Sequence, residues 1–224
     1  VTGRIVFPAG QLPRQGVVVT YNYGFSADMG GGEYERRLSQ PAEARIYRVD
    51  KKNRIQDALN QWAQASPKPR AAVIELTESG VYTEPLDIQL GADESLQIRA
   101  ANKKRPVIRL LDYLADRPDA FKVSGGKGSR LTLDGLLITG RGVQISGPEA
   151  GDNKPPAQPD MCSVIIRHCT LVPGWGLQCD CKPKRSSEPS LILVNTSAHL
   201  KIEHSIIGAI EVTADVDSTD PLCV

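Results

Sequence analysis

The chain has 224 residues, of which 40% are hydrophobic and 24% charged, a mixture typical of a folded domain with a sizeable core. Its 27 Lys and Arg nearly balance its 26 Asp and Glu, and this net charge of +1 argues against nucleic acid or an anionic membrane surface as a partner. No apolar run approaches the roughly 18 residues of a membrane span, and no secretory signal pattern opens the chain. Strand-like sequence at both ends leads us to expect a piece of a longer protein, cut within its C-terminal part.

The five cysteines are too few, and odd in number, for a closed disulfide framework. Cys179 and Cys181 form a C-x-C pair, which lacks the usual spacing of zinc ligands and has no second pair to complete a site. We therefore favour buried or incidental thiols over a zinc site, and we expect no metal and no cofactor.

Residues 1–50 are predicted to form a small β-rich extension. Runs at 4–7 and 17–21 favour strands and are separated by a turn region rich in Pro and Gly. Three glycines follow at 30–32, without the G-K-[ST] or G-x-G-x-x-G pattern of a phosphate-binding loop. We interpret them as a surface loop or a close approach of the backbone to a neighbouring segment.

A single amphipathic helix is predicted over residues 53–65. Ile55, Leu59 and Trp62 share one face, Asn53 suits the N-cap, and Ser66-Pro67 ends the helix. Short apolar runs follow at 73–76, 86–88, 96–98 and 107–110. One helix before a long series of short strands indicates a cap that covers the open end of a strand stack.

An internal repeat gives the strongest indication of the fold. Segments 131–138, 164–171 and 200–207 share one apolar pattern, a glycine follows each at intervals of 34 residues, and a second short strand comes after it at 143–145, 177–179 and 210–212. A β/α barrel needs helices between its strands, and an antiparallel sandwich does not require recurrence at the same phase. We therefore predict an all-β fold, a right-handed single-stranded parallel β-helix over residues 51–224.

Stacking such coils places outward-facing side chains in columns. Asp134, Arg167 and Glu203 form one column, which we interpret as a salt-bridge ladder rather than a catalytic acid–base cluster. Gly135, His168 and His204 form the next, at a corner. There a histidine suits hydrogen bonding to a turn, and a metal or general-base role is the alternative. If the chain were an enzyme, its candidate catalytic residues would be Arg141, Arg167, His168 and His204.

Four long polar loops, at 112–119, 147–160, 180–190 and 215–221, are predicted to follow the third strand of each coil. Loops at one phase would emerge from a single edge of the stack, where repeat proteins often bind their partners. The candidate binding residues on this edge are Asp112, Asp116, Asp152, Lys154, Asp180, Lys182, Lys184, Arg185 and Asp217.

The order of helix 55–59, strand 73–76, Gly80-Val-Tyr-Thr-Glu84 and strand 96–98 resembles the opening of the pectin-lyase-like superfamily. With the repeats, this resemblance covers residues 53–224. It implies a right-handed parallel β-helix in a superfamily that includes pectate lyases, polygalacturonases, pectin methylesterases, phage tailspikes and non-enzymatic surface proteins. The lyases hold calcium on outward carboxylates of neighbouring coils and use an arginine base, and the hydrolases need paired aspartates.

Neither catalytic pattern is reproduced in this chain, because Asp134 and Glu203 lie two coils apart with Arg167 between them. The corner position, where the family often stacks asparagine, carries His168 and His204 instead. The N-terminal segments 3–7 and 21–34 are similar to bacterial proteins of unassigned function, some of them phage-tail-like.

Together these features predict a non-catalytic structural or recognition module of a larger bacterial or phage-tail-like protein. We expect it to bind another protein or a polysaccharide through the loop edge, and to lie outside the cell or on a particle rather than in the cytoplasm. The alternative is a polysaccharide lyase or glycoside hydrolase. The sequence predicts no oligomeric state.

Overall fold

The computed structural model describes residues 10, 28–111, 120–147, 160–173, 179 and 188–213. These residues form one α-helix, α1 (Ile55–Ala63), and strands that assemble into three parallel sheets. Sheet A contains β1 (Arg45–Val49), β2 (Ala71–Leu76), β5 (Ser95–Ala100), β8 (Arg130–Asp134), β11 (Ser163–Arg167) and β14 (His199–Glu203). Sheet B contains β3 (Val81–Thr83), β6 (Val107–Arg109), β9 (Leu137–Gly140), β12 (Thr170–Pro173) and β15 (Ile206–Ile207). Sheet C contains β4 (Leu86–Leu90), β7 (Phe121–Gly125), β10 (Val143–Ser146), β13 (Leu191–Val194) and β16 (Ile210–Thr213).

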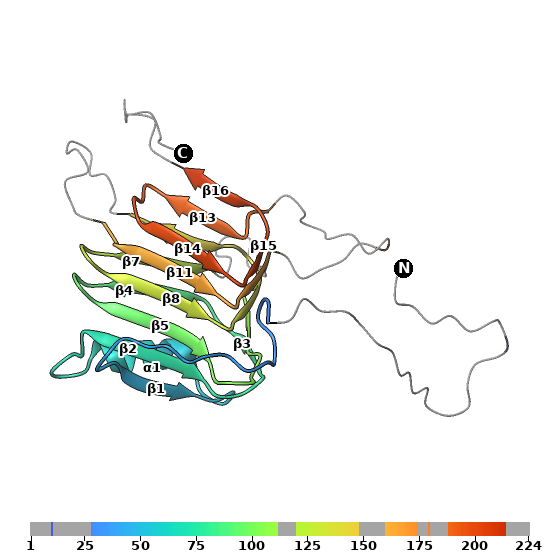
Figure 1. The fold of residues 1–224 in the computed structure, drawn as a ribbon, viewed down its shortest axis with the longest axis horizontal. Coiled ribbons are helices and arrows are strands. Elements are labelled where there is room, and N and C mark those ends of the chain that lie inside the picture. Colours follow the sequence, from blue (N-terminus) through green and yellow to red (C-terminus); the bar gives the residue numbers. More distant parts are fainter. Residues whose placement is uncertain are drawn as a thin grey trace.

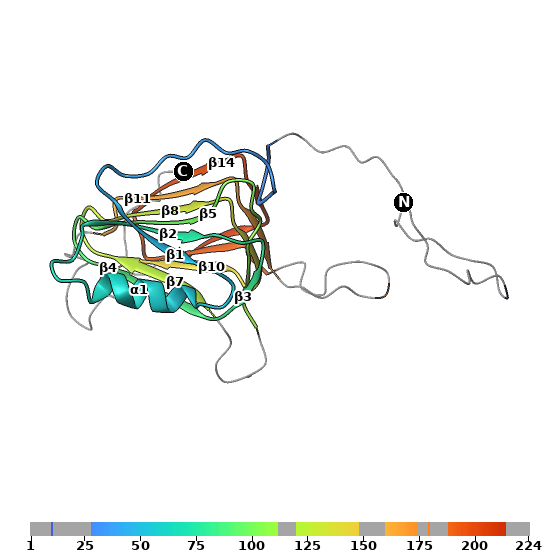
Figure 2. The same cartoon turned by 90° about the horizontal axis from the view of Figure 1, so that it is seen from below.

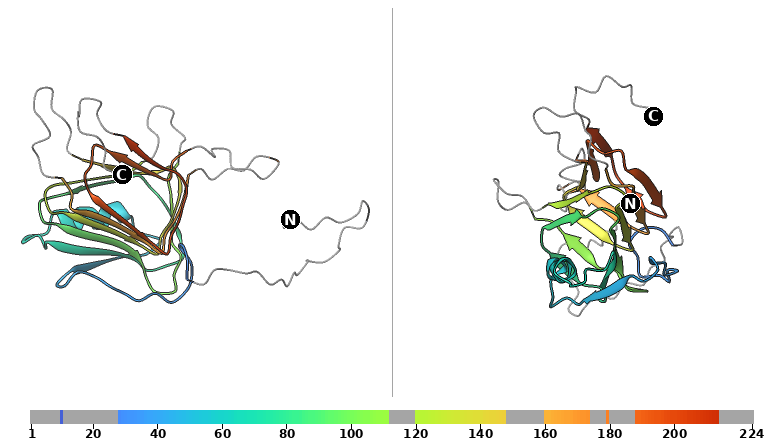
Figure 3. Two further views of the ribbon diagram at one scale, coloured as in Figure 1. Left: turned by 45° about the horizontal axis from the view of Figure 1, so that its top comes forward. Right: turned by 90° about the vertical axis from the view of Figure 1, so that its left-hand side faces the viewer.

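From β2 onward, the described chain visits sheets A, B and C in turn five times. Each visit forms one coil, so that coil one is β2–β3–β4 and coil five is β14–β15–β16. Figures 1 and 3 show the strands stacked as successive rungs of the three sheets. The prediction of a mostly β, parallel, repeating structure is confirmed.

The three repeat segments pair in the register that their apolar pattern predicts. Leu131, Val164 and Leu200 are neighbours on adjacent strands of sheet A. In sheet B, Leu171 pairs with Ile138 and with Ile207. Because side chains alternate between the two faces of a strand, these columns point into the interior and form its core. Leu131 and Val164 are accordingly buried.

The glycine interval of 34 residues is not the structural repeat. Gly140 pairs with Pro173 rather than with Gly174. In coil four, sheet C is completed by β13, which pairs with β10 on one side and β16 on the other. The prediction that 177–179 fills this place is therefore wrong, and Cys179 lies in a turn. Leu191 fits the place well, since it stacks on Val143 and is fully buried.

The helix α1 packs against β1, β2 and β4, with Ile55, Ala58, Leu59 and Trp62 buried. The Trp62 indole N–H donates to the Pro69 carbonyl at 2.8 Å, so the polar edge of this buried ring is satisfied. The predicted apolar face is therefore correct, and the helix begins two residues later and ends two residues earlier than predicted. It is nine residues long, and no helix of the described chain is long and apolar enough to cross a membrane.

The N-cap prediction for Asn53 is wrong. Arg54 takes the N-cap position without a side-chain cap, and Asn53 bonds to Asp50 instead. The carboxylate of Glu84, which follows β3, accepts hydrogen bonds from the Ile55 and Gln56 N–H groups at 2.8 and 3.1 Å. A buried carboxylate from coil one therefore satisfies the first turn of the helix and ties it to the stack.

The strand β1 comes before the helix and extends sheet A by one strand. It pairs with β2 along its whole length, from Arg45 opposite Ala72 to Val49 opposite Leu76. The strands predicted at 4–7 and 17–21 lie outside the described residues. Segment 28–44, which leads into β1, has no regular secondary structure and follows the outside of the stack (Figure 2).

Candidate functional site

A column of alternating charge runs along the outer face of sheet A. Its members are neighbours in the strand register, one from each strand. We call this column the charge ladder, and it consists of Arg48, Glu75, Arg99, Asp134, Arg167 and Glu203. The predicted three-residue column is therefore in register and is half of a longer one.

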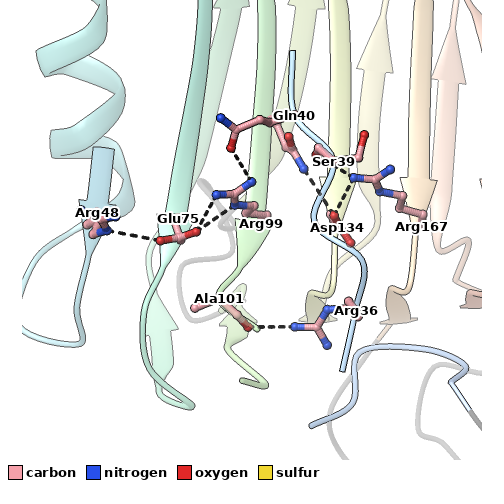
Figure 4. Close-up of polar contacts among 10 residues, drawn as sticks. Arg36, Ser39, Gln40, Arg48, Glu75, Arg99, Ala101, Asp134 and Arg167 are labelled. Atoms are coloured by element: carbon pink, nitrogen blue, oxygen red, sulfur yellow. Dashed lines mark hydrogen bonds and ion pairs between the residues drawn. The ribbon is translucent and has the colours of Figure 1, made fainter. Parts of the chain in front are cut away.

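Two ion pairs form the centre of the charge ladder (Figure 4). The Arg99 guanidinium donates to one Glu75 oxygen at 2.7 and 2.9 Å, and both side chains are largely buried. Asp134 Oδ2 accepts from Arg167 at 2.8 Å and from the Gln97 amide at 3.3 Å. These carboxylates are already paired with cations of the same sheet. At the exposed end, Glu203 pairs with Lys201 at 2.9 Å.

These outward-facing charges are buried because residues 28–44, here called the strap, lie over them. Gln40 Oε1 accepts a hydrogen bond from Arg99 at 2.9 Å, and the Ser39 carbonyl accepts one from Arg167 at 3.0 Å (Figure 4). The strap passes along the outer side of sheet A before it enters β1 (Figure 2). The central part of the outer face, around Glu75, Arg99, Asp134 and Arg167, is therefore covered by the protein's own chain.

Arg36 anchors the strap in a cage of carbonyl oxygens. Its guanidinium donates to the carbonyls of Gly32, Ala101 and Lys104 at 2.6, 3.0 and 3.0 Å, and the residue is only 4% exposed. The place beneath the guanidinium is formed by Gly135, where a Cβ atom would lie 2.7 Å from the guanidinium carbon. The missing side chain in the histidine column thus makes room for Arg36.

The histidine column lies where sheet A turns toward sheet B. Gly135, His168 and His204 all have positive φ angles, of 74°, 51° and 47°. The His168 and His204 rings are stacked, with centroids 5.1 Å apart and planes inclined by 11°. The corner prediction is thus correct, but the hydroxyl group that His168 contacts does not belong to its own turn.

His168 instead binds the strap. Its Nδ1 lies 3.0 Å from the hydroxyl of Tyr34, which donates its own hydrogen to the Gly30 carbonyl at 2.6 Å. Nδ1 must therefore carry the hydrogen that it gives to the Tyr34 oxygen. Burial lowers the pKa of His168, and burial raises the pKa of Tyr34 to about 12. Both groups are held neutral at physiological pH.

The glycines at 30–32 are a close backbone approach, as predicted. The Gly30 N–H donates to the His204 carbonyl at 2.7 Å, and the Gly31 N–H donates to Thr170 Oγ1 at 3.0 Å. A Cβ atom on Gly31 would lie 2.6 Å from the carbonyl oxygen of Leu136. Only residues without side chains let the strap lie this close to the corner.

The strap touches every coil, and its contacts are mainly polar. One residue from each coil illustrates this: Ser79, Asn102, Gly135, Thr170 and His204. Met29 and Leu38, its large aliphatic side chains, are 39% and 49% exposed. Net hydrogen bonds contribute about 0.5–1.5 kcal/mol each, and about 1.5–3 kcal/mol when one partner is charged. The free energy that keeps the strap on the stack is therefore a sum of small contributions from individual hydrogen bonds.

The structure brings together three of the four candidate catalytic residues. Arg167, His168 and His204 lie beneath the strap, but Arg141 lies between β9 and β10, at the far end of sheet B, and pairs with Glu188 at 3.3 Å. Sequence reasoning missed the strap residues Tyr34 and Arg36. It also missed three charge-ladder members, Arg48, Glu75 and Arg99, whose alternation becomes visible only when all six strands are aligned.

All nine candidate loop residues lie outside the described residues: Asp112, Asp116, Asp152, Lys154, Asp180, Lys182, Lys184, Arg185 and Asp217. The strands that flank these loops are described, however. Segments 112–119 and 174–187 lie between sheets B and C, whereas segment 148–159 lies between sheets C and A. The final segment, 214–224, follows a strand of sheet C. The prediction that these loops share one phase is therefore wrong, because the strands that precede them belong to two different sheets, B and C.

The described residues include no group of three or more His, Cys, Asp or Glu side chains placed to hold a metal ion. Cys169 is fully buried at the histidine corner, and burial raises the pKa of its thiol to about 12. Searches of family models, of curated proteins and of solved structures found no match to this chain.

Proposed function

We propose that the chain is a non-catalytic structural or recognition β-helix, part of a larger bacterial or phage-tail-like protein that acts outside the cell or on a particle. Its partner would be another protein or a polysaccharide, contacted through the long loops that follow strands of sheets B and C. The resemblance of residues 53–224 to the pectin-lyase-like superfamily supports the fold assignment. The similarity of segments 3–7 and 21–34 to bacterial proteins, some of them phage-tail-like, supports a place on such a particle.

The proposal includes a right-handed coil and a capping role for α1. Connections between parallel strands are right-handed in about 98% of cases, which favours this hand. The capping role of α1 is supported by its apolar face, which is buried against β1, β2 and β4, the first strands of sheets A and C.

One observation carries the non-catalytic assignment: the strap covers the outer face of sheet A, where the charged side chains already pair with one another. A polysaccharide enzyme needs carboxylates that are free to meet substrate. Glu75 and Asp134 instead accept from Arg99 and Arg167, and both arginines also bind the strap. This arrangement favours a rigid module over a lyase or hydrolase.

The test is incubation of the purified chain with a panel of acidic and neutral polysaccharides, followed by assays for unsaturated products and for new reducing ends. We expect neither product with any polysaccharide. Turnover that His168→Ala abolishes and Arg141→Ala leaves intact would overturn the proposal, because Arg141 lies away from the strap. Binding without turnover, measured on the same panel, would identify a polysaccharide partner, and absence of binding would favour a protein partner.

A further inference from the structure

The strap is held at its N-terminal end by a cluster whose charge depends on pH. Tyr34 contacts His168, the His168 ring stacks on His204, and the Gly30 N–H donates to the His204 carbonyl. Arg36 adds a permanent positive charge, with its guanidinium carbon 5.4 Å from the centre of the Tyr34 ring. The cluster therefore holds one fixed cation beside two stacked imidazole rings.

We propose that the strap is a pH-released latch, which covers the outer face of sheet A at neutral pH and leaves it when His168, stacked on His204 and in contact with Tyr34, becomes protonated. The proposal goes beyond the structural role proposed above and does not depend on it. It concerns a conformational device built into the chain, with the imidazole rings as the sensor and residues 28–40 as the moving part.

Two neighbours offset part of the added charge, because Asp134 and a hydrogen bond with the Asp28 backbone both raise the pKa of His168. Asp134 is paired with Arg167, and Glu203 is paired with Lys201. The charge of Asp28 in the strap also acts on Tyr34, and Cys169 stays an uncharged thiol. Burial, His204 and Arg36 outweigh these contributions, so the pKa of His168 is lowered, and protonation of its ring adds a charge beside Arg36 in a partly buried site.

The direction of the effect follows from His168. Its bond to Tyr34 uses Nδ1–H, so protonation at Nε2 leaves this bond in place and adds charge. Burial lowers the pKa of His168 below its ordinary value of about 6.5. The docked strap therefore favours the neutral ring. The stability of docking is fully present above about pH 6.5 and decreases as the pH falls through the lower value of the docked state.

Release requires that the strap leave without unfolding the stack, and its contacts fit this requirement. Residues 30–40 are anchored by polar contacts, and their aliphatic side chain, Leu38, is largely exposed. Strands β2, β5, β8 and β11 pair with each other independently of the strap. Segments held by polar contacts open locally at lower cost than core strands do.

The test is hydrogen–deuterium exchange of the full chain between about pH 7.5 and pH 5, with labelling times scaled to the intrinsic exchange rate. We expect peptides within 28–44 to lose protection below about pH 6.5, by up to about tenfold per pH unit for each proton taken up. Peptides from β5 and β8 should stay protected. Equal protection of the strap at both ends of this range would overturn the proposal.

Three single variants assign the effect to the histidine pair. His168→Gln and His204→Gln should each shift the loss of protection to lower pH or abolish it. His199→Gln is the matched control, because His199 is exposed at the start of β14, at the opposite end of this strand from His204. If His168→Gln releases the strap at every pH, the His204→Gln result decides. An unchanged pH response in His204→Gln would contradict the latch.

Discussion

Glu84 caps the N-terminus of α1, a role that the sequence pattern predicts for Asn53. Local sequence points to Asn53 because an N-cap usually comes from the residue just before a helix. The buried carboxylate of Glu84 reaches the same N–H groups from the end of β3, 29 residues away from Ile55. A pattern read along the chain cannot find a cap that arrives from the next coil, although Glu84 is the last residue of the G-x-Y-x-E turn.

Glu84→Ala should therefore destabilise the protein by about 1–3 kcal/mol, because it leaves two N–H groups of the first helical turn without an acceptor. Asn53→Ala should change the free energy of unfolding by less than about 0.5 kcal/mol, since Asn53 is exposed and does not cap the helix. Urea unfolding of both variants followed by circular dichroism gives the two values. Equal losses, or a larger loss for Asn53→Ala, would contradict the assignment of the cap.

The thiol of Cys169 should be chemically inert in the folded protein. Its pKa of about 12 and its complete burial leave almost no accessible thiolate, which is the reactive form. Iodoacetamide at about pH 8 should modify the exposed Cys162 and leave Cys169 unmodified, as measured by peptide mass spectrometry. In denaturant the two should react alike. Comparable modification of Cys169 without denaturant would show that this corner is open.

At the scale of whole elements, the inward columns of sheets A and B could be predicted, because burial imposes a period of two on every strand. Leu131, Val164 and Leu200 show this in three coils. The place of β13 could not be predicted, since a long segment separates it from β12, and the apolar pattern of the repeat does not continue across that segment at a fixed spacing. The strap was also missed. Its residues are polar and glycine-rich, and the contacts that position them exist only once sheet A has formed.

The charge ladder should contribute unequally along its length. Glu75→Gln leaves the buried Arg99 guanidinium without its counter-charge and should cost about 3 kcal/mol, the lower end for breaking a buried pair, because the amide still accepts a hydrogen bond. Glu203→Gln should leave the unfolding midpoint unchanged, since that side chain is exposed. Thermal or urea unfolding compares the two variants. Equal effects would mean that sheet A is not covered.

At the scale of the molecule, five coils are stacked with a helix at one end and a strap along one side (Figures 1 and 2). The fold class could be predicted because it repeats, and each coil restates the same pattern. The closed face could not be predicted, because it depends on a segment before the repeats that lies over all of them. The function proposed here follows from that closed face more than from any single residue.

Arginine footprinting at neutral pH tests this account most directly. Phenylglyoxal modifies accessible guanidinium groups, and mass spectrometry locates them. With the strap in place, Arg36 and Arg99 should resist modification, because they are 4% and 3% exposed. Arg48, whose side chain is 71% exposed at the end of the same charge ladder, should react readily. Modification of Arg99 and Arg36 at the rate of Arg48 would contradict the account, because the outer face of sheet A would then be open.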